Sequence, residues 1–328
     1  MTAVLEWDKA SQLVHEAERV LVLSHVNPDG DAFGSMLGLA AALKLMGKRV
    51  STAIDGGVLP EFRFLPGAEA VQSALERVDV DLVIAVDCGD ESRMGQVGHV
   101  ARASGAPLIN LDHHRTNTLF GDANLVNPQT VAAAEGVLDW LDRMGAALDY
   151  DTAYCLLTGL VTDTQCFRTS SVTSTTLSKA QRLMTYGPSL SEIVYRTVNR
   201  RPFTALRLWA EALPTVQLAD GVIWAVLTRA MYERAGYGCC DDAGLVSQLV
   251  QAEEAAISVV FRENDNGGVE IGIRSVPGCD VSEVAVALGG GGHPQAAGAT
   301  VRDEPLEALV PRVVRMLQDV VRQSTPTV

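Results

Sequence analysis

Residues 24–35, SHVNPDGDAFGS, contain three side chains that can bind a metal ion: His25, Asp29 and Asp31. An aliphatic run typical of a buried strand precedes this stretch, and an Ala- and Leu-rich run that predicts a helix follows it. The three groups therefore lie on a strand-to-helix turn, where open α/β sheets bind their ligands. Two carboxylates so close together repel each other, and a divalent cation would remove that repulsion.

The same arrangement recurs along the chain. Asp87 follows the aliphatic run 82–86, and Asp112 and His113 follow the run 107–111. An apolar helix is predicted at 150–161, and Asp163 follows it. Strands that alternate with helices predict a parallel βαβ sheet, in which the loops after the strands lie at one edge and converge.

Carboxylates and imidazoles without thiolates suit Mn²⁺ better than Mg²⁺, although Mg²⁺ remains an alternative. Six such groups exceed one site and predict two ions ~3.5–4 Å apart, between which a shared water would attack phosphorus in line. Asp87 is the expected bridge between the ions. His25 and Asp29 would complete the shell of the first ion, and Asp31, His113 and Asp163 that of the second.

Simpler interpretations stay open for each motif taken alone. Residues 27–30 could form an ordinary Asn-Pro-Asp-Gly turn with a solvated Asp. The glycine run 289–292 could be a flexible turn, or a bare backbone that approaches a phosphate or base. Arg274 could be a solvated strand residue.

The composition excludes several classes of protein. The chain has 328 residues, of which 47% are hydrophobic and 20% charged, as in a globular protein of two domains. Its net charge of −14 argues against a groove for long nucleic acids. We expect neither a signal peptide nor a membrane span. The six cysteines form no CxxC pair, and Cys239 and Cys240 are adjacent, which favours reduced thiols and a cytoplasmic location.

The pattern divides the chain into residues 1–187, a linker at 188–205 and a second domain at 206–328. In the first part, residues 117–128 are expected to form a polar connection. In the second, we expect strands at 215–228, 257–263 and 269–275, a helix at 241–253, and a hairpin turn at 264–268.

Five motifs together resemble the DHH phosphoesterase superfamily, and within it the nanoRNase and pAp-phosphatase group, distant relatives of RecJ-type exonucleases. The motifs are SHVNPDGDAFGS, VDCGD, LDHH, GLVTDT and, near the C-terminus, GGGGH. The resemblance implies an α/β fold in which a parallel-sheet DHH domain with flanking helices faces a smaller α/β domain across a cleft. It agrees with the two-manganese grouping.

The resemblance also implies roles for individual residues. Asp112 would orient its neighbours, and His114 would lie near the scissile phosphate, so that Asp87, Asp112 and His114 form the expected catalytic set. The second domain would hold the far end of the substrate. The expected substrate contacts are Arg274, Gly290, Gly291, Gly292, His293 and, beside the DHH triplet, Arg115.

The implied function is a Mn²⁺-dependent phosphodiesterase that trims short oligoribonucleotides or dinucleotides to mononucleotides and also dephosphorylates 3′-phosphoadenosine 5′-phosphate (pAp). A cyclic di-AMP or linear dinucleotide phosphodiesterase is the alternative. An inorganic pyrophosphatase and a catalytically silent nucleotide sensor are weaker rivals. Family analogy alone suggests a homodimer, and the direction of trimming stays open.

Overall fold

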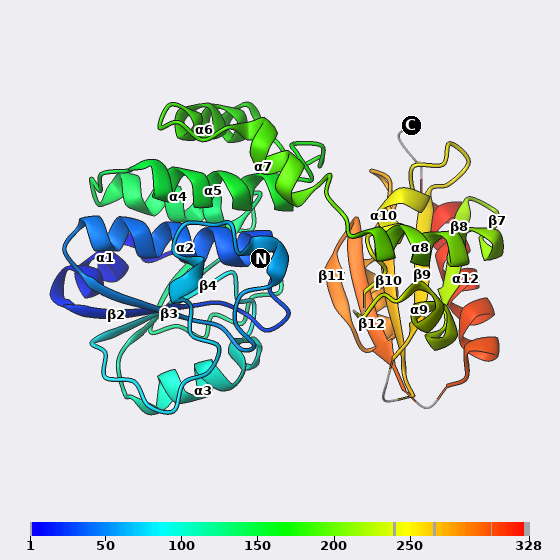
Figure 1. Cartoon of the computed structure of the whole chain (residues 1–328), viewed down its shortest axis with the longest axis horizontal. Helices are drawn as coiled ribbons and strands as arrows, with labels where there is room; N and C mark the ends of the chain where they lie inside the picture. Colours follow the sequence, from blue (N-terminus) through cyan, green and yellow to red (C-terminus); the bar gives the residue numbers. More distant parts are fainter. Residues whose placement is uncertain (1, 239–240, 265–266, 303, 325–328) are drawn as a thin grey trace. The chain divides into compact units, whose positions relative to one another are not determined.

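The computed structural model describes residues 2–238, 241–264, 267–302 and 304–324, so Cys239 and Cys240 lie outside the described residues. It divides into two compact units, Met1–Arg200 and Arg201–Val328 (Figure 1). Helices α7 (Leu190–Thr197) and α8 (Phe203–Ala212) lie on either side of this boundary. The domain limits at 187 and 206 stay a prediction.

The first unit is built on a sheet with the strand order β1-β6-β5-β4-β2-β3. Strands β2 to β6 pair in parallel, and the short β1 pairs antiparallel with β6. The parallel-rich α/β class predicted from the sequence is confirmed. The strands are β1 Val4–Leu5, β2 Arg19–Leu23, β3 Arg49–Ala53, β4 Leu82–Val86, β5 Leu108–Asp112 and β6 Ala123–Val126.

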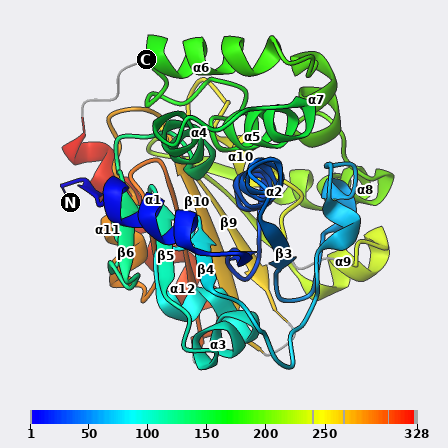
Figure 2. The same ribbon diagram turned by 90° about the vertical axis from the view of Figure 1, so that its left-hand side faces the viewer.

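Helices cover both faces of this sheet, which explains why its strands are aliphatic throughout (Figures 1 and 2). Val20 and Val22 of β2 point to the face covered by α1, α2, α4 and α5, whereas Leu21 and Leu23 point to α3. The helices of this unit are α1 Trp7–Glu16, α2 Gly30–Leu45, α3 Gly95–Ala103, α4 Ala133–Arg143, α5 Tyr150–Asp163, α6 Ser174–Met184 and α7, with short 3₁₀ turns at Pro60–Phe62, Ala68–Ala70 and Glu91–Met94.

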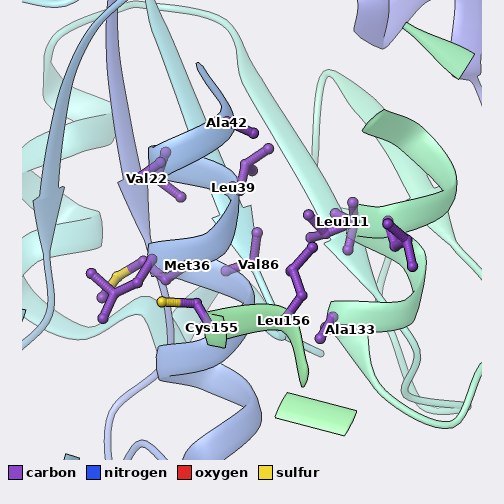
Figure 3. Packing of buried hydrophobic residues seen from close by; sticks show 14 of the residues in the cluster. Val22, Met36, Leu39, Ala42, Val86, Leu111, Ala133, Cys155 and Leu156 are labelled. Carbon is purple, nitrogen blue, oxygen red and sulfur yellow. The ribbon is translucent and has the colours of Figure 1, made fainter. Parts of the chain in front are cut away.

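Helices α2 and α5 pack unusually closely. A Cβ atom at Gly34 of α2 would lie 2.6 Å from the carbonyl oxygen of Cys155 and 2.7 Å from the nitrogen of Gly159, both in α5. Around this crossing, Met36, Cys155 and Leu156 join the core that covers the sheet (Figure 3). Glycine therefore brings together the two helices that carry Asp31 and Asp163.

The second unit has a sheet with the order β11-β12-β10-β9-β8-β7. Helices α11 and α12 pack on one face, and α8, α9 and α10 on the other. The strands are β7 Gln217–Ala219, β8 Val222–Leu227, β9 Ile257–Glu263, β10 Val269–Ser275, β11 Gly291–His293 and β12 Ala296–Val301; the remaining elements are α9 Arg229–Ala235, α10 Leu245–Leu249, α11 Ser282–Ala287, α12 Leu306–Gln323 and a 3₁₀ turn at Leu213–Thr215.

The predicted hairpin is present, since β9 and β10 pair antiparallel, although its turn residues Asp265 and Asn266 lie outside the described residues. The helix predicted at 241–253 is shorter than expected: Gly244 is its N-cap residue, and α10 covers only Leu245–Leu249.

The prediction of a polar connection at 117–128 was wrong for residues 123–126, which form β6. Asn124 made this segment look exposed, yet only 8% of the surface of Asn124 is accessible. Its side-chain amide bonds the backbone of Gly121 in both directions, at 3.0 and 3.1 Å, so the sheet tolerates it.

Two findings concern the whole described chain. Among the helices that the structure describes, none combines the length and apolar character that a membrane span requires. Cys88, Cys155, Cys166 and Cys279 are free thiols.

Candidate metal centre

The three central strands of the first sheet end at one place. Strands β2, β4 and β5 are parallel neighbours in register, so the residues that follow them share one edge. His25 follows β2, Asp87 follows β4, and His113 follows β5. Side chains that are distant in sequence thus meet at the carboxyl ends of the strands.

Asp87 lies at the centre of this group. Its Oδ2 is 3.3 Å from Nε2 of His25, and its Oδ1 is 3.5 Å from Nε2 of His113 and 3.7 Å from Nδ1 of His114. Only 2% of Asp87 is exposed, and no hydrogen bond from the described residues reaches Oδ1. The backbone of Asp87 adopts a left-handed conformation with φ of +57°, which is strained for Asp. A buried carboxylate oxygen without a donor is a suitable ligand for a cation.

Two groups of potential metal ligands adjoin Asp87. His25, Asp29 and Asp87 place one ligand atom each within 4.8 Å of the others. Asp31, His113 and Asp163 do the same. In the second group, Nε2 of His113 is 3.6 Å from Oδ2 of Asp163 and 4.0 Å from Oδ2 of Asp31. The structure therefore brings all six predicted ligands together, and Asp87, Asp112, His113 and His114 form a further, overlapping group; the division between two ions stays a prediction.

Backbone N–H groups hold two of the carboxylates in place. Asp29 caps α2, because its Oδ1 accepts hydrogen bonds from the backbone nitrogens of Asp31 and Ala32, each at 3.0 Å. Asp31 accepts from the first residues of α4, Ala133 at 2.5 Å and Ala134 at 3.0 Å. Sequence reasoning missed this second contact. The start of α4 has no side-chain cap of its own, and Asp31 supplies the missing acceptor.

His25 can present its Nε2 nitrogen to an ion. Its Nδ1 lies 2.8 Å from the carbonyl oxygen of Val26 and 2.9 Å from Nη2 of Arg93. If Nδ1–H donates to Val26, the Nε2 lone pair is left on the side of Asp87, as metal ligation requires.

The electrostatics of the site indicate that cations are needed there. Burial, followed by the charges of Asp87 and Asp163, raises the pKa of Asp31 well above its usual range. Burial, with Asp29 and Asp87, raises the pKa of Asp163 to about 7. Burial also opposes ionisation of Asp87, but the His113 and His25 imidazoles beside it outweigh burial and lower the pKa of Asp87. The residues present therefore fit divalent ions, which neutralise buried carboxylates better than two imidazoles do.

Asp112 and His114 form a second layer around Asp87. Asp112, 2% exposed, accepts a hydrogen bond from Nδ1–H of His114 at 2.7 Å. Burial opposes its ionisation, but the bond from His114 lowers the pKa of Asp112. Asn117 donates a hydrogen bond to Asp112, and Asn110 in turn accepts one from Asn117; sequence reasoning missed both. The available signal was a polar Asn110 inside the otherwise aliphatic run LINLD.

The predicted substrate contacts lie in both units. Arg115 is exposed, next to His114 in sequence. In the second unit, Arg274 and His293 both pair with Ala296, from opposite sides of β12. Arg274 is largely buried and donates to the carbonyl oxygen of Ile273 at 2.9 Å, while its Nε has no partner among the described residues. Burial lowers the pKa of Arg274.

The three glycines predicted to contact substrate differ from one another. A Cβ atom at Gly290 would lie 2.1 Å from the carbonyl oxygen of Gly298, and one at Gly292 would lie 2.5 Å from that of Ala296. Glycine is thus required at both positions for the chain to pack on β12. A Cβ atom at Gly291 would face open space, so glycine is not required there; Gly290 and Gly292 are exposed and Gly291 is half-buried.

Comparison with known proteins identifies both units. Residues 19–160 match the DHH family, N-terminal domain, and residues 242–323 match the DHHA1 domain. The chain is 35% identical over 302 residues to the bifunctional oligoribonuclease and PAP phosphatase NrnA of Thermus thermophilus, covering 92% of this chain and 89% of that protein.

Solved structures share the fold. The chain is similar to an exopolyphosphatase-related protein from Bacteroides fragilis, with a TM-score of 0.88 and 23% identity over 96% of this chain and 97% of that one. It also resembles RecJ of Thermus thermophilus, solved in complex with Mn²⁺, with a TM-score of 0.56 and 16% identity over 99% of this chain and 56% of that one.

Proposed function

The chain belongs to the DHH family, and on that premise we propose that it is a metal-dependent phosphodiesterase that degrades short oligoribonucleotides to mononucleotides and dephosphorylates pAp. The observation that carries the proposal is the arrangement around Asp87, where two groups of ligands adjoin one buried carboxylate. The activities for which the Thermus relative is named support the same substrates, and the similarity to that protein covers 92% of this chain.

Two divalent ions, Mn²⁺ or alternatively Mg²⁺, would be held by the six ligands, with Asp87 between them. His25 and Asp29 would bind the first ion, and Asp31, His113 and Asp163 the second. When bound, such ions make a water nucleophilic near neutral pH and stabilise charge that develops on a phosphoryl group. Imidazole ligands favour Mn²⁺, and the RecJ structure in complex with Mn²⁺ agrees with that preference.

The remaining residues would position the substrate. His114, whose Nδ1–H donates to Asp112, would contact the scissile phosphate through Nε2. Arg115 would add a charge beside it. In the second unit, the Arg274 guanidinium, His293 and the backbone of the glycines at 290–292 would bind a phosphate or base of the substrate.

The preference for short substrates follows from charge. A net charge of −14 gives long polyanions no attractive surface, whereas two ions and a few cationic side chains suffice for one or two phosphates. A cytoplasmic location and a homodimer belong to the same proposal.

Hydrolysis of labelled substrates tests the proposal. With Mn²⁺, we expect cleavage of a diribonucleotide and of pAp, and much slower cleavage of a 20-mer. Equal cleavage of the dinucleotide and the 20-mer would overturn the short-substrate claim. Chromatography of the products from cyclic and linear dinucleotides separates this function from the alternative cyclic di-AMP phosphodiesterase.

Two variants test the mechanism. Asp87→Ala and His113→Ala should each lower kcat by about 1,000-fold or more, since both remove a metal ligand. Activity that survives either substitution would rule out the arrangement of ions around Asp87.

A further inference from the structure

We propose that Asn117 is a positioning residue for the phosphoester hydrolysis proposed above, on which this inference rests: it holds the Asp112 carboxylate and, through it, the His114 ring. The proposal comes from a chain of buried hydrogen bonds. Nδ2 of Asn117 donates to Oδ2 of Asp112 at 2.6 Å, and Oδ1 of the same carboxylate accepts from Nδ1 of His114 at 2.7 Å.

The chemistry of the neighbours determines how the Asn117 amide is oriented. Its Oδ1 accepts a hydrogen bond from the backbone nitrogen of Leu119 at 2.7 Å. Its Nδ2 faces three acceptors: the Asp112 carboxylate, Oδ1 of Asn110 at 2.9 Å and the carbonyl oxygen of Cys88 at 3.1 Å. The opposite orientation would place an acceptor against acceptors, so Asn117 must act as a donor to Asp112.

The same network ties the DHH triplet to the loop that carries Asp87. Asn110 is fully buried on β5 and donates to the carbonyl oxygen of Cys88 at 3.0 Å, the atom that Asn117 also approaches. Cys88 follows Asp87 directly. One side chain of the loop after β5 therefore links the end of β4 to the carboxylate that orients His114.

The consequence for the reaction concerns geometry. Asp112 is 2% exposed, and Asn117 occupies the oxygen that His114 does not use. Without Asn117 this carboxylate can rotate, and the direction of the His114 ring is no longer defined. His114 is the residue proposed to contact the phosphate, so kcat should fall while the metal groups keep their ligands.

Asn117→Ser is the sharpest variant. Serine keeps an oxygen that can accept from the Leu119 nitrogen, but its side chain is one bond shorter, so its single hydroxyl cannot also replace the amide donor to Asp112. Asn124→Ser is a matched control, because Asn124 is also 8% exposed and its side chain bonds only to Gly121 and Glu6 among the contacts described for it. We expect Asn117→Ser to lower kcat for pAp by about 10- to 100-fold with little change in KM, and Asn124→Ser to leave kcat near that of the wild type.

A double-mutant cycle distinguishes positioning from general destabilisation. In a His114→Ala background, Asn117→Ser should have almost no further effect on kcat, because its target is gone. The same fold-loss in both backgrounds, or an unchanged kcat in Asn117→Ser alone, would overturn the proposal. An inactive wild-type protein would instead overturn the proposed function.

A spectroscopic readout does not depend on activity. In the Mg²⁺-loaded protein with ¹⁵N-labelled histidine, the Nδ1–H proton of His114 should give a downfield resonance that exchanges slowly with water; it is assigned by its loss in His114→Ala. We expect this resonance to persist in Asn124→Ser and to broaden or vanish in Asn117→Ser. If it is absent from the wild type, or unchanged in Asn117→Ser, Asn117 does not hold the pair in place.

Discussion

Replacing Asp163 with Asn should stabilise the metal-free protein, although the change removes a proposed metal ligand. Burial, with the charges of Asp29 and Asp87, raises the pKa of Asp163 from 3.8 to about 7. Between these two pH values the folded protein keeps a proton that the unfolded chain has lost. The stability of the wild type therefore falls as the pH rises through this range, and the loss is complete above about pH 7.

The size of the effect follows from the pKa of Asp163. The difference between 3.8 and about 7 corresponds to about 4 kcal/mol, at about 1.4 kcal/mol per pKa unit. The side chain is 29% exposed, and contact with water reduces this cost, so we expect about 2–4 kcal/mol. Asparagine carries no charge, and the variant escapes the loss. His113 keeps the Asp87 carboxylate as a charged neighbour in the variant, with its Nε2 3.5 Å from Oδ1 of Asp87.

Urea unfolding in EDTA measures this difference. The advantage of Asp163→Asn in free energy of unfolding should grow between about pH 5 and 7 and then level off. Asp151→Asn, at the exposed opposite end of α5, is the matched control and should show no such trend. With Mn²⁺ at 1,000 times its Kd in place of EDTA the order should reverse, since a ligand at that concentration adds about 4.1 kcal/mol to the protein that binds it.

Either of two results in EDTA would show that the buried charge of Asp163 does not destabilise the metal-free protein. One is an Asp163→Asn protein less stable than the wild type at pH 8.5. The other is an advantage that does not change between pH 5 and 8.5, which would point to a packing effect in place of a charge effect.

Three further substitutions test how the fold supports the site. Gly34→Ala should lower the free energy of unfolding by about 1–3 kcal/mol or more, because the added methyl group meets the backbone of α5. The control Gly136→Ala in α4 should be neutral or slightly stabilising, because its methyl group meets only Leu111 at 3.4 Å. Thermal melts compare the two variants. Thr164→Val should lose about 1–3 kcal/mol of stability and part of the protection by Mn²⁺, because the Thr164 hydroxyl bonds Leu160 and Phe167 around the end of α5. Thr164→Ser keeps the hydroxyl and should therefore retain both the stability and the protection. Arg274→Gln should raise KM for pAp by about 10-fold with a smaller change in kcat, and an unchanged KM would remove Arg274 from the substrate contacts.

The sequence predicted the position of the site better than its support. An acid or imidazole at the end of an aliphatic strand can be recognised locally, and parallel pairing then brings such residues together, as happened for His25, Asp87 and His113. The contact of Asp31 with Ala133 and Ala134 could not be predicted, because it joins helices a hundred residues apart through backbone atoms that no residue type reveals. Strand β6 was missed because the polar Asn124 satisfies its amide within its own turn.

The site also gathers backbone strain that no local pattern reveals. Left-handed conformations occur at Asn27, at Asp87 and at the three consecutive residues Gln165, Cys166 and Phe167 that follow the Asp163 helix. Each costs on the order of 1 kcal/mol or more for a residue other than glycine, and each lies in a loop that carries a proposed ligand. Hydrogen bonds of the Thr164 hydroxyl hold the last of these turns, and backbone N–H groups hold the Asp29 and Asp31 carboxylates against the repulsion of neighbouring carboxylates.

The surrounding fold therefore carries both costs before any ion binds. The stability that offsets these costs comes from the well-packed crossing of α2 and α5 and from the aliphatic sheet beneath it. Because the carboxylates are already held close together, an ion need not reorganise the loops, and its binding energy can go into neutralising charge. Asp163→Asn and Gly34→Ala should therefore change the free energy of unfolding in opposite directions. The first removes a destabilising buried charge at the site, and the second weakens the packing of α2 on α5 that supports the site. Their effects on the stability of the metal-free protein should thus have opposite signs, and the double variant should fall between the two single ones, because Gly34 contacts α5 at residues 155 and 159 and not at Asp163 itself.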